Sequence, residues 1–169
     1  MQKPKLIIGS IVVVAVAIVW YLFRPELIFV NRTVHETLPG SATSTSTAQG
    51  SQATVLATGR FHSVSHETSG VATIHQLRDG KRLVRFTTFE TSNGPDVRIY
   101  LVPAKDATDN ETVPRAGFVD LGAMKGNRGD QNYDIPSNID LSQYQSVTIW
   151  CRRFGVNFAT APLTSPTQI

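Results

Sequence analysis

The chain has 169 residues, of which 41% are hydrophobic, so it can bury the core of one domain of ordinary size. Its formal net charge is +3, but four of the 16 basic residues and two of the 13 acidic residues precede residue 40. The rest of the chain therefore has 12 basic and 11 acidic residues, and this excess of positive charge is too small for nucleic-acid binding. The one cysteine, Cys151, excludes an intramolecular disulfide and a cysteine-rich zinc site.

The first element is an uncharged run from Leu6 to Phe23, LIIGSIVVVAVAIVWYLF. Its 18 residues would form a helix about 27 Å long, close to the thickness of a bilayer core. A cleaved signal peptide and a buried core helix are the alternatives, but the run ends in the bulky residues 20–23, which suit a membrane interface and not a peptidase site. We therefore expect residues 1–24 to be a signal-anchor transmembrane helix whose partner is the lipid bilayer.

The flanks of this run predict its orientation. Lys3 and Lys5 precede it with the terminal amine, whereas Arg24 is followed closely by Glu26. Because positive charge favours the cytoplasmic side, we expect the N-terminus in the cytoplasm and the rest of the chain outside it, in a single-pass cell-membrane protein.

A juxtamembrane segment and spacer are expected next, over residues 25–54. Gly40 to Gly50 reads GSATSTSTAQG, which is rich in Ser, Thr and Gly and has no apolar period. Such a composition is typical of a flexible linker, so we expect the folded domain to span residues 55–165.

Short alternating runs dominate the remaining sequence. In residues 71–77 and 83–89 two sets of side chains alternate with period two, which predicts two strands. Asp79-Gly80 between them is a strong hairpin signal. Further strands are expected in segments bounded by Gly, Pro, Asn or Asp: 97–102, 118–121, 132–135, 146–152 and 155–158. The prediction is an all-β domain, an antiparallel β-sandwich or open barrel, preceded by one transmembrane α-helix.

Several segments, in the same order along the chain, together resemble the DM13 domain family. The resemblance covers about Thr58 to Leu163, and the segments are Gly59-Arg60-Phe61, Ser92-Asn93-Gly94-Pro95-Asp96, Asp120-Leu121-Gly122, Lys125-Gly126-Asn127, Gly129-Asp130-Gln131-Asn132-Tyr133 and Val147-Thr148-Ile149-Trp150-Cys151. It implies a β-rich extracytoplasmic domain that takes part in electron transfer through a cysteine at the position of Cys151. We expect a bacterial, membrane-anchored member with an extracytoplasmic redox or protein partner.

From its own neighbours, Cys151 allows two interpretations. Period two places it on one strand face with Val147 and Ile149, which is typical of a buried structural cysteine. Arg152 and Arg153 follow directly, and nearby cations favour the reactive thiolate. The two function hypotheses are therefore a redox module with Cys151 as the reacting residue and a non-catalytic surface module with a structural cysteine.

Three histidines are candidate ligands for a metal or haem. His62 and His66 are four residues apart, but this spacing shares a face only on a helix, and the region, with His75, is predicted as strand and turn. We therefore predict no metal site and keep His66 as a candidate binding residue, because a histidine at its position is implied by the family resemblance.

Asn93, Asp96 and Trp150 are the other candidate binding residues. Asp96 lies in a Gly-Pro-Asp sequence that equally favours turn chemistry, with the carboxylate bonded to local backbone amides. Trp150 falls on the strand face opposite Cys151. No hydrolase, kinase or metalloprotease motif is present, and no cofactor is indicated, so the chain is not expected to be an ordinary enzyme.

Overall fold

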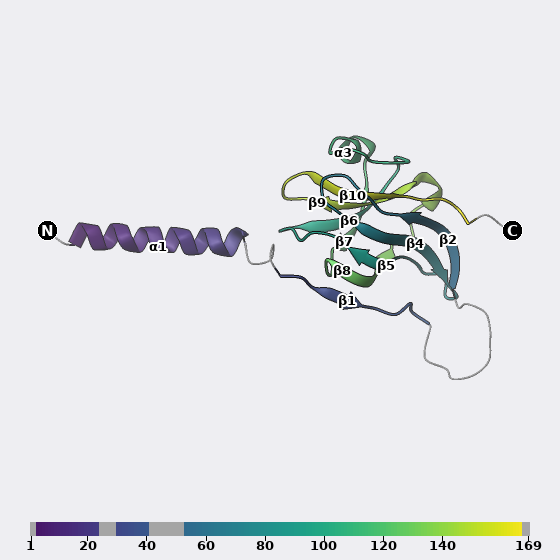
Figure 1. The fold of residues 1–169 in the computed structure, drawn as a ribbon, viewed down its shortest axis with the longest axis horizontal. Helices are drawn as coiled ribbons and strands as arrows, with labels where there is room; N and C mark the ends of the chain where they lie inside the picture. The colour runs from purple at the N-terminus through teal and green to yellow at the C-terminus, as the bar shows by residue number, and fades with distance from the viewer. Residues whose placement is uncertain (1–2, 24–29, 41–52, 167–169) are drawn as a thin grey trace.

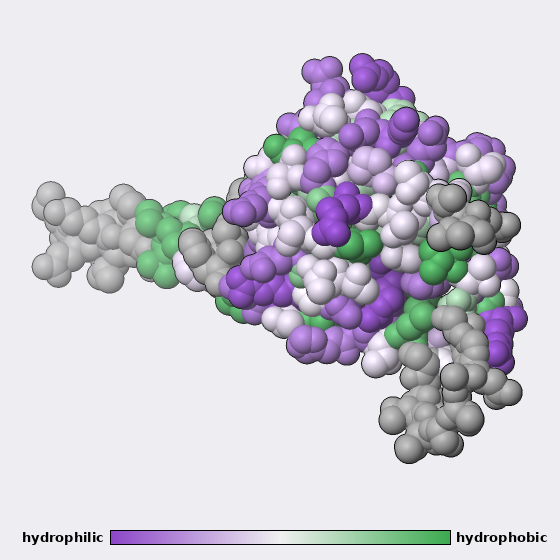
Figure 2. Space-filling view, turned by 45° about the vertical axis from the view of Figure 1, so that its right-hand side comes forward, coloured by the Kyte–Doolittle hydropathy of each residue, from purple (hydrophilic) through white to green (hydrophobic). Residues whose placement is uncertain are grey.

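The computed structural model of the protein describes residues 3–23, 30–40 and 53–166, and within the first helix, α1 (Lys3–Phe23), side chains from Ser10 to Tyr21. Figure 1 shows α1 set apart from a β-rich domain that contains the rest of the described chain. In that described part of the protein, no helix is both long and apolar enough to cross a membrane. The domain surface in Figure 2 is mainly hydrophilic, with scattered apolar residues.

Two five-stranded sheets form the domain. The first contains, in spatial order, β1 (Thr33–His35), β8 (Arg128–Ile135), β5 (Arg82–Glu90), β4 (Ser69–Leu77) and β2 (Ala53–Arg60). The second contains β3 (His62–Ser63), β10 (Val156–Pro162), β9 (Ser146–Cys151), β6 (Val97–Val102) and β7 (Val119–Ala123). The prediction of a mostly β domain is confirmed. Among the residues that the structure describes, the short helices are α3 (Thr112–Ala116) and the 3-10 turn η1 (Leu141–Gln143).

The predicted hairpin joins β4 to β5. Gly80 adopts a φ of 82°, which a glycine reaches at no steric cost. The amide of Leu77 donates to the carbonyl of Lys81 at 2.8 Å, and the strands continue in antiparallel register from Gln76 opposite Arg82. Local turn chemistry therefore specifies this pairing, as the sequence indicated.

The edge strand β1 differs from the predicted antiparallel pattern, because it runs parallel to β8, with Val34 opposite Gly129. Its close approach depends on glycine: a Cβ on Gly126 would collide with the carbonyl of Arg32, and one on Gly129 with the carbonyl of Val34. Part of the juxtamembrane segment expected over residues 25–54 thus lies against the domain, whereas the expected spacer, Gly40 to Gly50, lies outside the described residues apart from Gly40. We call residues 30–40 the N-terminal strap.

The main core lies between the sheets. Phe61 meets Phe86 edge to face, with ring centroids 5.0 Å apart, and Phe89 packs at 4.9 Å from Phe86. From the opposite sheet, the buried residues Ile99 and Ile149 join the same cluster. This shared core identifies a sandwich, the first of the two predicted architectures.

A second, smaller core covers the outer face of the β6–β9 sheet. Tyr100 and Trp150 project from β6 and β9 onto Ala107 and Val113, which belong to the connection that carries α3. Figure 1 shows α3 as a third layer over these strands. Both faces of β9 are therefore covered, and all its residues, Ser146–Cys151, are buried.

Candidate functional site

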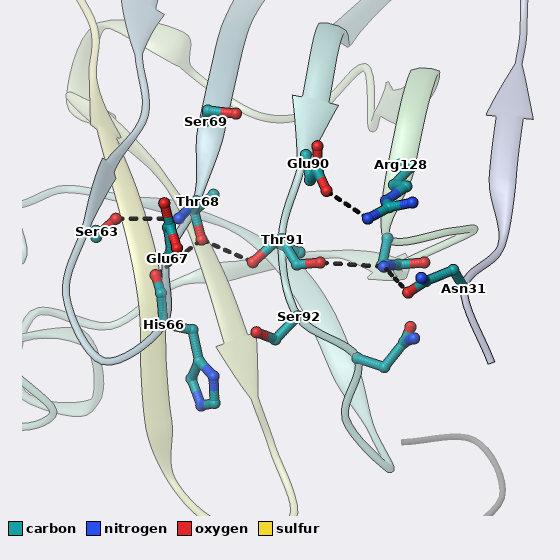
Figure 3. Close-up of a pocket in the computed structure, with 12 residues that line it drawn as sticks. Asn31, Ser63, His66, Glu67, Thr68, Ser69, Glu90, Thr91, Ser92 and Arg128 are labelled. Carbon is teal, nitrogen blue, oxygen red and sulfur yellow. Dashed lines mark hydrogen bonds and ion pairs between the residues drawn. The ribbon is translucent and has the colours of Figure 1, made fainter. Parts of the chain in front are cut away.

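A polar pocket of about 770 Å³ opens at one end of the sandwich (Figure 3). Its wall is built from three loops and the strap: Asn31 before β1, residues between Ser63 and Ser69, the end of β5 from Glu90 to Asn93, and Asn127 with Arg128 at the start of β8. We call it the loop pocket. Its volume falls in the range of small-molecule and cofactor sites, although such sites are usually more apolar.

Hydrogen bonds join the separate parts of this wall. The hydroxyls of Thr68 and Thr91 lie 2.7 Å apart, and the Asn127 amide group donates to the Thr91 carbonyl at 3.1 Å and to the Asn31 side-chain oxygen at 2.9 Å. Asn127 is only 2% exposed. Because these bonds link groups far apart in sequence, the pocket is pre-formed and does not depend on a ligand for its shape.

His66 and Asn93, two of the predicted binding residues, both line the loop pocket. The His66 ring lies against Phe158 with centroids 3.8 Å apart, and burial lowers the pKa of His66 below its ordinary value. Asn93 donates to the carbonyl of Val30 at 2.8 Å. The side chains offered to a ligand here are therefore a neutral imidazole and an amide that already contacts the strap.

Asp96 lies in a neighbouring pocket of about 300 Å³, which shares Asn93 with the loop pocket. Val30, which accepts the Asn93 hydrogen bond, lines this smaller pocket as well. Its carboxylate accepts from Arg152 at 2.7 Å and lies 4.0 Å from Arg98. The predicted bonding to local amides is not what holds it, since both side-chain contacts are to arginines, Arg98 on β6 and Arg152 directly after β9. A ligand cation at Asp96 would have to compete with these two arginines.

Cys151 is 1% exposed at the end of β9. It stands opposite Val97 on β6 and Val156 on β10, and it belongs to the main core with Ile149. Thiol–disulfide exchange requires a thiolate that another sulfur can reach. In this fold the sulfur is shielded, which favours the structural interpretation of the two that the sequence left open.

The structure separates Trp150 from the other candidates. Its side chain points to the opposite face of β9 from Cys151 and packs in the second core, away from the pocket walls. His62 and His75 are apart from His66 as well: His62 lies 2.8 Å from Asp106, and His75 is on β4. Among the described residues, no group of three or more histidine, cysteine or acidic side chains could hold a metal ion.

Sequence reasoning missed the contribution of the strap to the pocket. Asn31 and the buried pair Thr68 and Thr91 belong to no motif that predicts a pocket, and only long-range pairing brings them to one wall. The glycines of the Lys125-Gly126-Asn127 and Gly129-Asp130 segments were the available signal, because a glycine in a strand suggests close approach of another backbone.

Comparison with known proteins gives one family. Residues 60–163 match the family described as Electron transfer DM13. No curated protein and no solved structure matches the chain significantly. The matched range includes Cys151 and most of the loop pocket but not the strap.

Proposed function

Since the chain belongs to the DM13 family, described as electron transfer, we propose that it is a membrane-anchored module that docks a redox partner outside the cytoplasm. In this proposal the N-terminal helix holds the domain at the bilayer and the loop pocket receives the partner. The observation that carries it is the strap: Asn31 lines the pocket and follows the end of α1 at Phe23 closely in sequence. At about 3.8 Å per residue, the pocket wall lies within about 30 Å of the helix end.

The sequence supports the anchor. Leu6–Phe23 contains no charged residue over 18 positions, which is enough to cross a bilayer core as a helix. Backbone groups in lipid must be satisfied internally, and a continuous helix does this. In the structure residues 3–23 are helical, but the described part of the chain contains no helix that is long and apolar enough to cross a membrane, so the proposed anchor rests on the sequence. A cytoplasmic N-terminus would then place the domain and its pocket on the outer side.

The burial of Cys151 supports docking in place of direct thiol chemistry. A partner that exchanged a disulfide with this residue would have to displace core side chains such as Ile149 to reach the sulfur. The loop pocket is open and polar, so a partner can bind there without opening the sandwich. This proposal combines the family's electron-transfer role with the binding-module hypothesis for the domain itself.

Reduction of ferricyanide, an anionic one-electron acceptor that does not cross membranes, tests the proposal in intact cells of the native host. Deletion of the chain should lower the rate, and Ser92→Arg, which places a long side chain in the loop pocket, should lower it similarly. Ser137→Arg, in a separate pocket lined by Leu141 and Ser142, is the matched control and should leave it unchanged. A deletion without effect overturns the electron-transfer role.

The same assay separates the two roles proposed for the cysteine. Cys151→Ala should reduce ferricyanide at the wild-type rate if the partner docks at the loop pocket. A rate as low as that of the deletion strain, with normal protein levels, would instead support reaction at the thiol. An unaffected Ser92→Arg strain alongside an impaired deletion strain would overturn docking at this pocket.

A further inference from the structure

The turn between β9 and β10 presents an aromatic ring to solvent. It consists of Arg152, Arg153, Phe154 and Gly155, and we call these residues the arginine turn. Phe154 is 60% exposed at its tip, and Gly155 adopts a φ of 64°, which lets the chain reverse there. A single exposed ring needs no explanation by itself, so the surroundings of the arginine turn decide its role.

The arginine turn lies at the end of the sandwich where the chain arrives from α1. The backbone amide of Arg152 donates to the carbonyl of Asp96 at 2.9 Å, which holds the turn against the loop before β6. The same loop holds the start of the strap, because Asn93 donates to the carbonyl of Val30 at 2.8 Å. Figure 1 shows the β9–β10 turn and the start of the strap at the same end of the domain.

The length of the connection keeps this end near the proposed anchor. Val30 is seven residues after Phe23, the last residue of α1 and of the uncharged run. At about 3.8 Å per residue, the two Cα atoms are separated by at most about 27 Å. If the uncharged run crosses the bilayer, Phe23 lies at the level of the lipid headgroups. The end of the sandwich with the arginine turn is then the end that the tether holds beside the lipid.

The other side chains at this end also suit a lipid surface. The 300 Å³ pocket beside the strap is lined by the apolar residues Val30, Pro95 and Met124 and by the basic residues Arg32 and Lys125. Val30 is 58% exposed. Aromatic and apolar side chains bury themselves in the headgroup region of a bilayer, while arginine and lysine reach the lipid phosphates.

The charge at this end is complementary to anionic lipid. Asp96 is the one acidic residue in the lining of this pocket and in the arginine turn, and its carboxylate contacts Arg152 at 2.7 Å. Lys125 is also compensated, by Glu36 at 2.8 Å. The basic residues of the two regions, Arg32, Lys125, Arg152 and Arg153, still outnumber these two carboxylates, which leaves an excess of positive charge.

We propose that the arginine turn is a membrane-surface contact, in which Phe154 inserts among the lipid headgroups and the surrounding basic side chains face the lipid phosphates. This rests on the proposed membrane anchor. The loop pocket shares Asn93 with the pocket beside the strap, so the contact holds the loop pocket next to the bilayer. The redox partner that fits this arrangement is one bound to or embedded in the same membrane.

Fluorine NMR of the full-length protein in lipid nanodiscs tests the contact. The nanodiscs contain phosphatidylcholine and phosphatidylglycerol, and some headgroups carry a nitroxide, which broadens the signals of nearby fluorine nuclei. Trifluoromethylphenylalanine replaces Phe154 in one sample and Phe118 in the other. The signal from position 154 should be broadened strongly and that from position 118 only weakly. Equal broadening at the two positions, or none at position 154, overturns the proposal.

Phe118 is a matched control because it is also exposed but lies elsewhere on the domain. It is 46% exposed, and its ring stacks on Tyr100 with centroids 4.0 Å apart. It precedes Val119, which pairs with Leu101, whereas the arginine turn follows Cys151, which pairs with the other end of β6. Slow modification of the Cys151 thiol by N-ethylmaleimide shows that each labelled protein is folded.

The lipid composition separates the two parts of the contact. In nanodiscs of phosphatidylcholine alone, the broadening at position 154 should be weaker, because the basic side chains lose their anionic partners. Equal broadening in neutral and anionic nanodiscs overturns the role of the basic side chains.

The same samples distinguish failure of this contact from failure of the proposed function. Full-length protein that leaves the nanodiscs in high salt overturns the anchor, and the contact with it. Protein that stays in the nanodiscs with an unbroadened signal from position 154 overturns the contact alone. A deletion strain with an unchanged rate of ferricyanide reduction overturns the electron-transfer role and not the contact.

Discussion

The guanidinium of Arg152 lies 2.7 Å from the carboxylate of Asp96. The side chain that directly follows Cys151 is therefore engaged with a carboxylate on the loop before β6, and its charge is compensated there. A thiolate is favoured by nearby cations that are free to stabilise it. In this fold the pairing of Arg152 with Asp96 and the burial of the Cys151 sulfur both argue against an activated thiol.

The first prediction concerns the accessibility of this thiol. N-ethylmaleimide should modify Cys151 very slowly in the folded protein and rapidly once guanidinium chloride unfolds the domain, because the residue is 1% exposed. Mass spectrometry after timed quenching gives the modified fraction. Modification of the folded protein at the rate of a free thiol would show that the sulfur is open to solvent.

Substitution of Cys151 provides the matching stability measurement. Cys151→Ser places a hydroxyl among Val147 and Ile149, and an unpaired buried polar group costs about 1–3 kcal/mol. Cys151→Ala is the control, since it shortens the side chain without adding a polar group. The serine variant should have the lower free energy of unfolding in urea titrations of the two.

Local signals account for the parts of the fold that the sequence predicted. The β4–β5 hairpin follows from period-two alternation on either side of Asp79-Gly80, which needs no information from elsewhere in the chain. Strand β1 could not be predicted in this way, because three residues have no recognisable period. It pairs with β8, far along the chain, and it depends on the absence of a side chain at Gly126 and Gly129.

The site was only partly predictable for the same reason. His66 and Asn93 were chosen from motif positions, and the fold brings both into one pocket. Trp150 was chosen from the separate Val147–Cys151 segment and faces the second core, since β9 is buried on both sides and period two alone does not show where each face leads. The stacking of Tyr100 on Phe118 arises from diagonal neighbours on adjacent strands, which only the register reveals.

The second prediction is that Gly126→Ala detaches the N-terminal strap. A methyl group there would collide with the backbone carbonyl of Arg32 and lie 2.8 Å from the Val34 side chain, so the strap must move. Hydrogen exchange at the strap amide of Glu36, which donates to Asp130 at 3.0 Å, should become fast. The amides of the β4–β5 hairpin should keep their protection.

Gly122→Ala is the matched control for this variant. Its φ of 119° makes alanine strained, but nothing lies within 4 Å of the added methyl group. It should lower overall stability without selectively exposing the strap. Equal release of the strap in both variants would contradict the collision as the cause.

The third prediction is that acid weakens the strap at Glu36. Burial acts to raise the pKa of Glu36, but the Lys125 side chain at 2.8 Å and the Asn132 amide at 2.7 Å outweigh it, so the net effect lowers the pKa. A lowered carboxyl pKa gives stability that is present above the ordinary value of 4.5 and is lost as pH falls through the folded-state pKa. Exchange of strap amides, corrected for intrinsic rates, should accelerate over that acidic range.

Glu36→Gln distinguishes the carboxylate from general acid unfolding. The amide still offers an oxygen to the Asn132 N–H but does not titrate, so strap protection should be weaker at neutral pH and change less below pH 4.5. The same acid dependence in both proteins would assign the effect to other groups.

The fourth prediction tests the proposed topology. Proteinase K added to intact cells should degrade the β-domain, because an anchor over Leu6–Phe23 with a cytoplasmic N-terminus leaves the domain outside. An epitope at the N-terminus should stay protected until the membrane is permeabilised. Protection of the domain and digestion of the N-terminal epitope would reverse the orientation.

The last prediction concerns Tyr133, which supports the loop beneath the strap. Its hydroxyl donates to Gln131 at 2.7 Å and accepts from the Lys125 amide at 3.1 Å, while burial raises the pKa of Tyr133 so that the phenol stays neutral. Tyr133→Phe leaves the Lys125 amide without this acceptor and should lower the free energy of unfolding by about 1–3 kcal/mol. Tyr144→Phe is the control. Because Gln131 also bonds both backbone groups of Gly126, Tyr133→Phe should loosen the strap as well. Loss of stability with undiminished strap protection would show that the loop is held without Tyr133.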